Sequence, residues 1–340
     1  MLMEGDIMLT PRQNFIETIT GGKPDRFVNQ YEALAFLREG NPVSKAHPMV
    51  RPGGENAVDG WGVTRSWPAG LPGPFPVHDE AHKLVKDMTK WRDVVKHPSL
   101  DYSDEAWAEA RAAAAAVNRE EQLPTLMMAP GVFEQVHYLT SIDDALVYFY
   151  TEPEALHELI DYITDYEIAY AELLIKNYQP EALFHHDDWG SHNSSFMSPD
   201  MFREFLLPAY KKIYGFHKAN GIKYIIHHSD SYAANLVPMM IEMGIDVFQG
   251  CVTTNNVPEL VKKYGGQISF MGDLNNGVLD VPDWTPELIA REVERACRTN
   301  GKLYFIPCMT AGGPGSSYPG VYDEVTAAID RFSAAHYAEL

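Results

Sequence analysis

The sequence predicts an α/β protein, a (β/α)8 TIM barrel with an N-terminal helical and loop extension. After about residue 120, short apolar runs of strand type alternate with longer helical patterns, as in a parallel sheet. The 340 residues fit one barrel of about 250 residues with extensions. We therefore expect a single domain, with residues 1–80 as extension and lid-like loops and residues 81–340 as main barrel. A doubly wound open sheet is the alternative, but neither a GxGxxG motif nor a P-loop motif follows any strand.

The extension is predicted to begin with one short helix. Thr10 and Pro11 suit an N-cap and a first helical position, and the pair Gly21-Gly22 suits a stop. A strand is expected over Phe27–Ala33. The Gly- and Pro-rich region that follows is more typical of a lid or binding wall than of a linker, and its Trp61 is either a packing anchor or a wall for a flat substrate.

The remaining elements follow from apolar runs and helical periodicity. Strands are predicted at Thr125–Ala129, Ala182–His186, Tyr224–His228, Val247–Gly250, Ile268–Met271 and Leu303–Pro307. Helices are predicted at Asp104–Gln122, Pro153–Tyr178, Pro199–Asn220, Ala234–Met243, Val257–Tyr264 and Thr285–Asn300.

Polar residues follow each predicted strand, where a barrel of this type has its active site. They include Glu134, the HHDDWGSHN stretch from His185 to Asn193, HHSD ending at Asp230, Gln249 and Cys308. His, Cys and carboxylate side chains suit zinc, which keeps an open position when three protein ligands bind it. The predicted zinc ligands are Glu134, His228 and Cys308, with Asp230 as a fourth. Taken singly, each histidine is more often a hydrogen-bonded structural residue, and only the coincidence of several at strand ends makes a metal site equally compatible.

Two further features near the strand ends carry alternatives. The pair Asp187-Asp188 suits a general acid or base, or an acceptor for a substrate hydroxyl, since adjacent carboxylates in a closed site raise one pKa; the structural alternative is that one of them caps the turn that follows. Gly312, Gly313 and Gly315 can bring backbone N–H groups to an anion or simply serve a tight turn.

The composition argues against several partners. The formal charge of −20 disfavours nucleic acid and anionic membrane surfaces. Three cysteines do not make a disulfide framework, and the chain starts without a signal-peptide pattern, which indicates the cytoplasm. No apolar run approaches the roughly 18 residues of a membrane span.

Several motifs together resemble the uroporphyrinogen decarboxylase superfamily, and within it the corrinoid-linked methyltransferases. They are TPRQNFIETITGGKPDR near the start, VDGWGV at 58–63, GVFEQ at 131–135, HHDDWGSHNSSFMSPDMFREFLLPAYKKI at 185–213, HKANGIKYIIHHSDS at 217–231 and IPCMTAG at 306–312. The resemblance implies a (β/α)8 barrel with its site at the strand ends. It also implies zinc, cobalamin carried by a separate corrinoid protein, and a homodimer as one compatible assembly.

Two departures from the family patterns bear on the activity. The arginine-bearing segment of the decarboxylases is replaced by DRFVNQYEALAF, and Asp230 stands where the thiol methyltransferases that resemble this chain have a cysteine. The harder ligand set favours an oxygen substrate over a thiol. The resemblance then points to an O-demethylase that takes a methyl group from a small methoxylated, aromatic compound.

The resemblance also distributes roles over the candidate residues. Asp187, Asp188 and Asp230 are the predicted catalytic acids, and Trp61, Phe133, Tyr138, His186 and Asn193 the predicted substrate contacts. The alternatives are a methyltransferase acting on a thiol such as coenzyme M, a metal-free decarboxylase, and a binding protein without catalysis.

Overall fold

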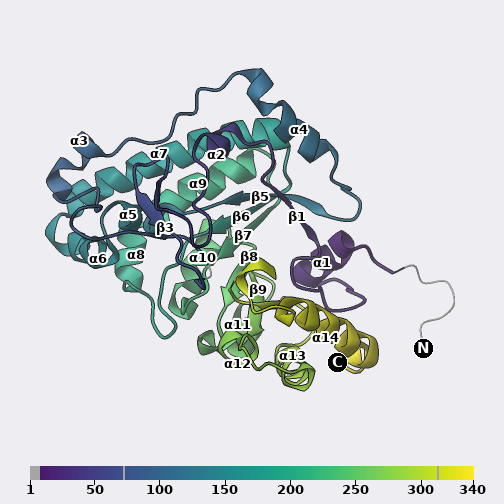
Figure 1. The fold of residues 1–340 in the computed structure, drawn as a ribbon. Coiled ribbons are helices and arrows are strands. Elements are labelled where there is room, and N and C mark those ends of the chain that lie inside the picture. Colours follow the sequence, from purple (N-terminus) through teal and green to yellow (C-terminus); the bar gives the residue numbers. More distant parts are fainter. Residues whose placement is uncertain (1–7, 72, 312–313) are drawn as a thin grey trace.

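Seven parallel strands form one curled sheet at the centre of the chain (Figure 1). The computed structural model describes residues 8–71, 73–311 and 314–340. The strands are β1 (Leu34–Leu37), β5 (Leu123–Met128), β6 (Ala182–His186), β7 (Tyr224–His228), β8 (Val247–Cys251), β9 (Ser269–Leu274) and β10 (Phe305–Met309). They lie side by side in chain order, as in an α/β barrel. The predicted TIM-barrel-like class is confirmed, with seven strands rather than eight in the sheet that the described residues form.

The first strand lies later than predicted. Residues 27–29 are irregular, residues 30–33 form a turn, and β1 begins at Leu34. Gln30 has a left-handed backbone conformation with φ of 50°, and the Asn29 side chain donates to the Thr326 carbonyl. The prediction over Phe27–Ala33 was wrong because this segment bonds to the last helix instead of a neighbouring strand.

Helices cover the outside of the sheet (Figure 1). The longer ones are α1 (Pro11–Thr20), α4 (Ala108–Ala115), α5 (Val132–Leu139), α6 (Ile142–Thr151), α7 (Pro153–Tyr178), α8 (Pro199–Phe205), α9 (Leu207–Ala219), α10 (Val237–Met243), α11 (Val257–Tyr264), α13 (Pro286–Asn300) and α14 (Val321–His336). The shorter ones are α2 (Pro42–Ala46), α3 (Trp91–Val94) and α12 (Asn276–Leu279). The predicted start of α1 is confirmed, because the Thr10 side chain accepts from the Gln13 N–H and Gly21 ends the helix with φ of 74°.

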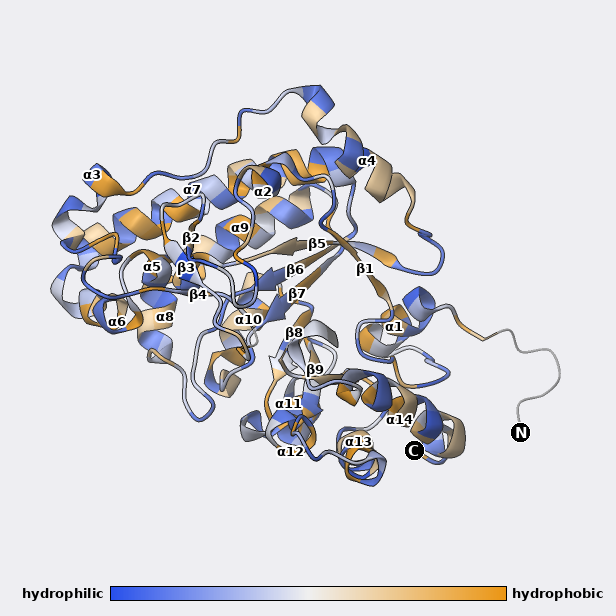
Figure 2. Cartoon of the chain, in the orientation of Figure 1, coloured by the Kyte–Doolittle hydropathy of each residue, from blue (hydrophilic) through white to orange (hydrophobic). Residues whose placement is uncertain are grey.

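Alternation along the strands separates two apolar regions. On β7, Ile226 belongs to the cluster inside the barrel, whereas Ile225 packs toward the outer helices. His227 and His228 continue the alternation, so that His227 contacts Trp189 on the helix side and His228 contacts Phe184 on the barrel side. The strands are mainly hydrophobic in Figure 2, and polar residues gather at the carboxyl ends of β6 and β7.

A small antiparallel sheet lies in the Gly- and Pro-rich region. Its strands are β2 (Ala57–Val58), β3 (Thr64–Ser66) and β4 (Phe75–Pro76). Gly312 and Gly313, which the sequence suggested as backbone anion contacts, lie outside the described residues. Among the helices that the structure describes, none is long and apolar enough to cross a membrane.

Candidate functional site

A cavity of about 1170 Å³ opens over the carboxyl ends of the first strands. Its wall includes Trp61 and Arg65 from the small-sheet region, Tyr138 from α5, and residues from the ends of β1, β6 and β7. Long insertions thus provide one side of the cavity and rigid strand ends the other. This is the position in which barrels of this class carry their sites.

Three side chains at the ends of β6 and β7 form the one group in the described residues that is suited to hold a metal ion. The group comprises His186, Asp188 and His228, whose ligand atoms all lie within 4.8 Å of one another. The parallel register places His186 directly beside His228, and their rings stack with centroids 4.3 Å apart. All three residues line the cavity.

Both histidines are oriented through their Nδ1 atoms. His186 Nδ1 lies 2.7 Å from Glu134 Oε2, and His228 Nδ1 is hydrogen bonded to Gln249 Oε1. In a neutral ring, donation of the Nδ1–H to an oxygen leaves the Nε2 lone pair free, which is the tautomer that a metal requires. Two histidines and one carboxylate make three protein ligands with an open position, as in catalytic zinc sites.

The surroundings of the two histidines shift their pKa values in opposite directions. Burial lowers the pKa of His228 to about 3, and the positive charge of His186 adds to this effect. Burial opposes the charge on His186 as well, but the adjacent Glu134 carboxylate outweighs it and raises the pKa of His186 to about 10. A metal ion at the Nε2 atoms would take the place of that proton.

Asp188 and Asp230 face the same region. Asp188 Oδ1 accepts from the Asp230 backbone N–H at 2.9 Å. Burial, and then the Asp188 carboxylate, raise the pKa of Asp230 to about 7. Burial also raises the pKa of Asp188, while His186 opposes that shift. These two predicted catalytic acids therefore lie on the cavity wall.

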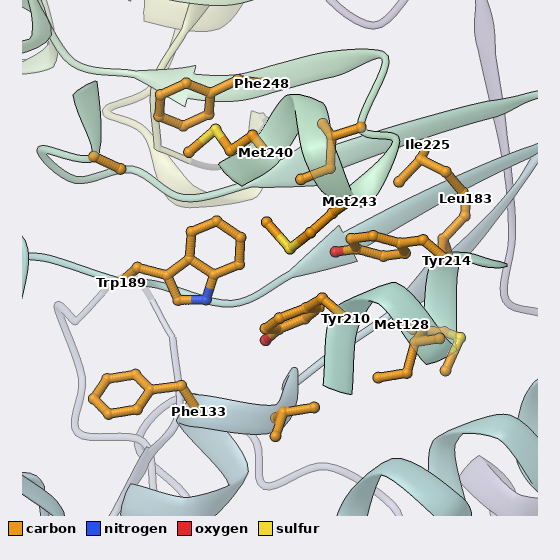
Figure 3. Close-up of a cluster of buried hydrophobic side chains, with 14 of the residues drawn as sticks. Met128, Phe133, Leu183, Trp189, Tyr210, Tyr214, Ile225, Met240, Met243 and Phe248 are labelled. Carbon is orange, nitrogen blue, oxygen red and sulfur yellow. The ribbon is translucent and has the colours of Figure 1, made fainter. Parts of the chain in front are cut away.

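Asp187 occupies a different place from Asp188. Its side chain is fully buried and does not line the cavity. It accepts from the N–H groups of Phe133 and Glu134, at 3.0 and 2.7 Å, which are the first-turn donors of α5. Trp189 Nε1 and the Tyr210 hydroxyl also donate to it. Figure 3 shows Trp189 and Tyr210 beside each other in the apolar cluster behind the strands. Asp187 therefore acts as a cap, but for α5, which precedes it in the chain, and not for the turn that follows it as the sequence suggested.

The predicted zinc ligands Glu134, His228 and Cys308 are not brought together as one group. Glu134 holds His186 in place and accepts from the Tyr138 hydroxyl at 3.2 Å. Cys308 is fully buried in the cluster inside the barrel, and burial raises the pKa of its thiol to about 12. The Cys308 thiol is not a member of the group formed by His186, Asp188 and His228.

The predicted substrate contacts divide in the same way. Trp61, Tyr138 and His186 line the cavity. Phe133 is buried away from it against Phe149 and Phe196, and Asn193 lies in an exposed turn. Adjacent residues of a helix point in directions about 100° apart, so Phe133 of α5 packs behind the cavity while Glu134 lies on its wall. Our sequence reasoning missed Arg38, Phe36 and Phe184 as cavity residues.

Comparisons with known proteins agree with this architecture. The family model for uroporphyrinogen decarboxylase matches residues 73–319. The methylated-thiol–coenzyme M methyltransferase of Methanosarcina mazei is 29% identical over 182 residues, which cover 53% of this chain and 46% of that protein. The match thus spans about half the length of that relative.

A solved structure shows the same fold at lower identity. A methyltransferase from Methanosarcina mazei superposes with a TM-score of 0.67 at 14% identity, covering 95% of this chain and 99% of that one. Both relatives are methyltransferases, in agreement with the branch that the motifs suggested. The extent of the family match, the curled parallel sheet and the position of the cavity lead to one conclusion: the chain belongs to the uroporphyrinogen decarboxylase family.

Proposed function

We propose that this protein is a methyltransferase that takes a methyl group from a methoxylated aromatic compound and delivers it to the cobalt of a separate corrinoid protein, assisted by zinc. The observation that carries the proposal is the group His186, Asp188 and His228 on the wall of a wide cavity. The family membership and the two methyltransferase relatives support the reaction class.

The residues present fit a zinc ion in two respects. The donor set is His2Asp, and each histidine has its second nitrogen bonded to an oxygen that fixes the ring. When bound, zinc would supply Lewis-acid stabilisation of charge on the departing oxygen. His186, Asp188 and His228 would hold it. In this arrangement Glu134 orients His186, and Asp230 stays free beside the group.

The rest of the cavity fits a flat methoxylated ring. Trp61 stacks edge-to-face on Tyr166 at 4.9 Å, and both residues line the cavity with Tyr138. These rings provide apolar contact and exclude water from the ether. As the methyl group leaves, the ether oxygen keeps the bonding electron pair and takes up a proton. Asp230 is the carboxyl group on the cavity wall that would provide this proton.

The test is anaerobic turnover with a reduced corrinoid protein and a panel of methoxyarenes, alongside metal analysis. We expect stoichiometric zinc and release of the demethylated phenol. An Asp230→Asn variant is expected to keep its zinc and lose at least about 100-fold in rate, the lower end of the usual range for a missing general acid. Absence of zinc together with absence of methyl transfer from every methoxyarene would refute the proposal.

The second candidate function is methyl transfer to a thiol. The coenzyme M methyltransferase relative favours it, while the absence of a cysteine from the described metal-binding group speaks against it, since thiolate ligands suit thiol activation at zinc. The same corrinoid protein, supplied in its methylated form, separates the two. Methylation of 2-mercaptoethanesulfonate without demethylation of methoxyarenes would establish the second function.

A further inference from the structure

Arg38 is a cation on the cavity wall without an acidic partner among the described residues. It directly follows β1, is exposed, and lines the cavity. Its guanidinium lies 5.4 Å from the centre of the Phe36 ring and donates to the thioether of Met127. A thioether is a weak acceptor, so most of the five donors of this guanidinium stay available.

The second arginine of the cavity shows the contrast. Arg65 donates to the Pro74 carbonyl at 2.9 Å and lies 3.7 Å from the Asp59 carboxylate. Its charge is thereby compensated. Although part of its side chain is exposed, the partial burial of the Arg38 guanidinium lowers its pKa, and no neighbouring carboxylate counters that effect. Arginine nevertheless stays protonated, so an uncompensated positive charge faces the cavity of a protein whose formal charge is −20.

An aromatic wall runs from Arg38 to the metal-binding group. Phe36 on β1 contacts Phe184 on β6 with ring centres 5.4 Å apart. Phe184 in turn contacts His228 with ring centres 5.7 Å apart. All of these side chains line the cavity. These aromatic side chains thus form an apolar surface between a cation at one end and His186, Asp188 and His228 at the other.

We infer that the substrate is a methoxylated aromatic acid whose carboxylate binds Arg38 while its ring lies on Phe36 and Phe184. The inference rests on the proposed function for the identity of the methoxy group. A guanidinium matches a carboxylate with two parallel hydrogen bonds, which adds orientation to affinity. Binding at Arg38 directs the opposite end of the ring toward the His186–Asp188–His228 group.

Binding measured by calorimetry on the zinc-loaded full chain tests this without any turnover. The ligand pair is 4-methoxybenzoate and its neutral isostere 4-methoxybenzamide. We expect the acid to bind at least about tenfold more tightly, as for one charge-assisted hydrogen bond or more. In Arg38→Gln the preference for the acid should fall to about twofold or less, because the charged guanidinium with its paired N–H donors is missing.

Arg92→Gln is the matched control, since Arg92 also stacks on an aromatic ring, Trp91, but lies outside the cavity. It should keep the full preference. Arg38→Lys keeps the charge without the fork, and should lose at least about threefold of the preference; it decides the matter alone if thermal scans show Arg38→Gln unfolded. The inference is overturned if the wild type does not prefer the acid to the amide. It is also overturned if the variants at position 38 keep the full preference for the acid.

A third ligand distinguishes the source of the anion. If 2-mercaptoethanesulfonate binds through Arg38 and 4-methoxybenzoate does not, the anionic site belongs to a thiol acceptor and the inference is overturned. The proposed function has its own outcome. Methyl transfer from neutral methoxyarenes, without a binding preference for the acid, would support the proposed function and refute the aromatic-acid substrate. A binding preference for the acid without any methyl transfer would support the anion site at Arg38 and refute the proposed function.

Discussion

At the scale of single residues, Glu134 determines how His186 is presented. Its carboxylate accepts a hydrogen bond from Nδ1 of His186, which leaves Nε2 of that ring to bind a metal ion. We predict that Glu134→Gln weakens zinc binding about 10- to 100-fold, the usual effect of losing a partner behind a ligand. Competition with a chelating dye measures it. Glu172→Gln, an exposed position on α7, is the control; unchanged zinc affinity in Glu134→Gln would contradict the assignment.

A second prediction at this scale separates two ligand sets. If His186, Asp188 and His228 hold the ion, Asp188→Asn loses a charged ligand and should bind zinc substoichiometrically, while Cys308→Ala retains it. The measurement is metal content after gel filtration in dilute chelator. The reverse pattern, with zinc lost only from Cys308→Ala, would establish the ligand set predicted from the sequence, Glu134, His228 and Cys308.

At the scale of elements, Asp187 joins the end of β6 to the start of α5. An asparagine at this position replaces one acceptor oxygen with an NH2 group, which leaves buried donors of Trp189, Tyr210 or the first turn of α5 without an acceptor. We predict that Asp187→Asn lowers the free energy of unfolding by about 2–4 kcal/mol. Urea denaturation measures this. Asp200→Asn, exposed in the first turn of α8, should change it by less than about 1 kcal/mol. Equal stabilities of the two variants would refute the anchoring role.

The elements that the sequence predicted well have strong local signals. Apolar runs with defined ends predicted β6, β7, α7 and α11 with the bounds that the structure shows. The predicted helix over 199–220 is divided into α8 and α9 at Leu206, since Pro208 cannot donate its backbone N–H. The helix α5 was missed because GVFEQVHY was interpreted only as a polar strand end.

The location of the site at the strand ends could be predicted from the sequence, but the contacts between its side chains could not. Strand ends located His186, Asp188 and His228 at one mouth, because carboxyl ends of parallel strands meet there. Which side chains touch depends on register between β6 and β7, and no single-sequence pattern reports register. Likewise, the separation of Phe133 from Glu134 follows from how α5 docks, which depends on the buried Asp187 contact.

At the scale of the whole molecule, an ion-pair cluster joins the first helix to the amino-terminal side of the barrel. The Glu181 carboxylate, just before β6, accepts hydrogen bonds from the two terminal guanidinium nitrogens of Arg12 on α1, at 2.8 and 2.9 Å. It also accepts one from the Lys223 ammonium group at 2.7 Å. The cluster holds segments more than 160 positions apart in sequence together. The hydrogen bonds from Arg12, above all, lower the pKa of Glu181 to about 2 from its usual 4.5.

A carboxylate whose pKa is lowered by folding stabilises the protein at a pH above its unfolded pKa. This contribution is complete above about pH 5 and is lost as the pH falls toward 2, because the unfolded chain takes up the proton first. Solvent screening of this partly exposed cluster reduces it to about 1–2 kcal/mol. We predict that the stability difference between the wild type and Glu181→Gln, measured by urea denaturation, is largest at pH 7 and shrinks by about 1 kcal/mol at pH 3. Glu242→Gln, in an ion pair confined to α8, α9 and α10, controls for general charge effects. A difference that does not change between pH 7 and pH 3 would mean that the Glu181 carboxylate does not stabilise the attachment of α1 to the barrel.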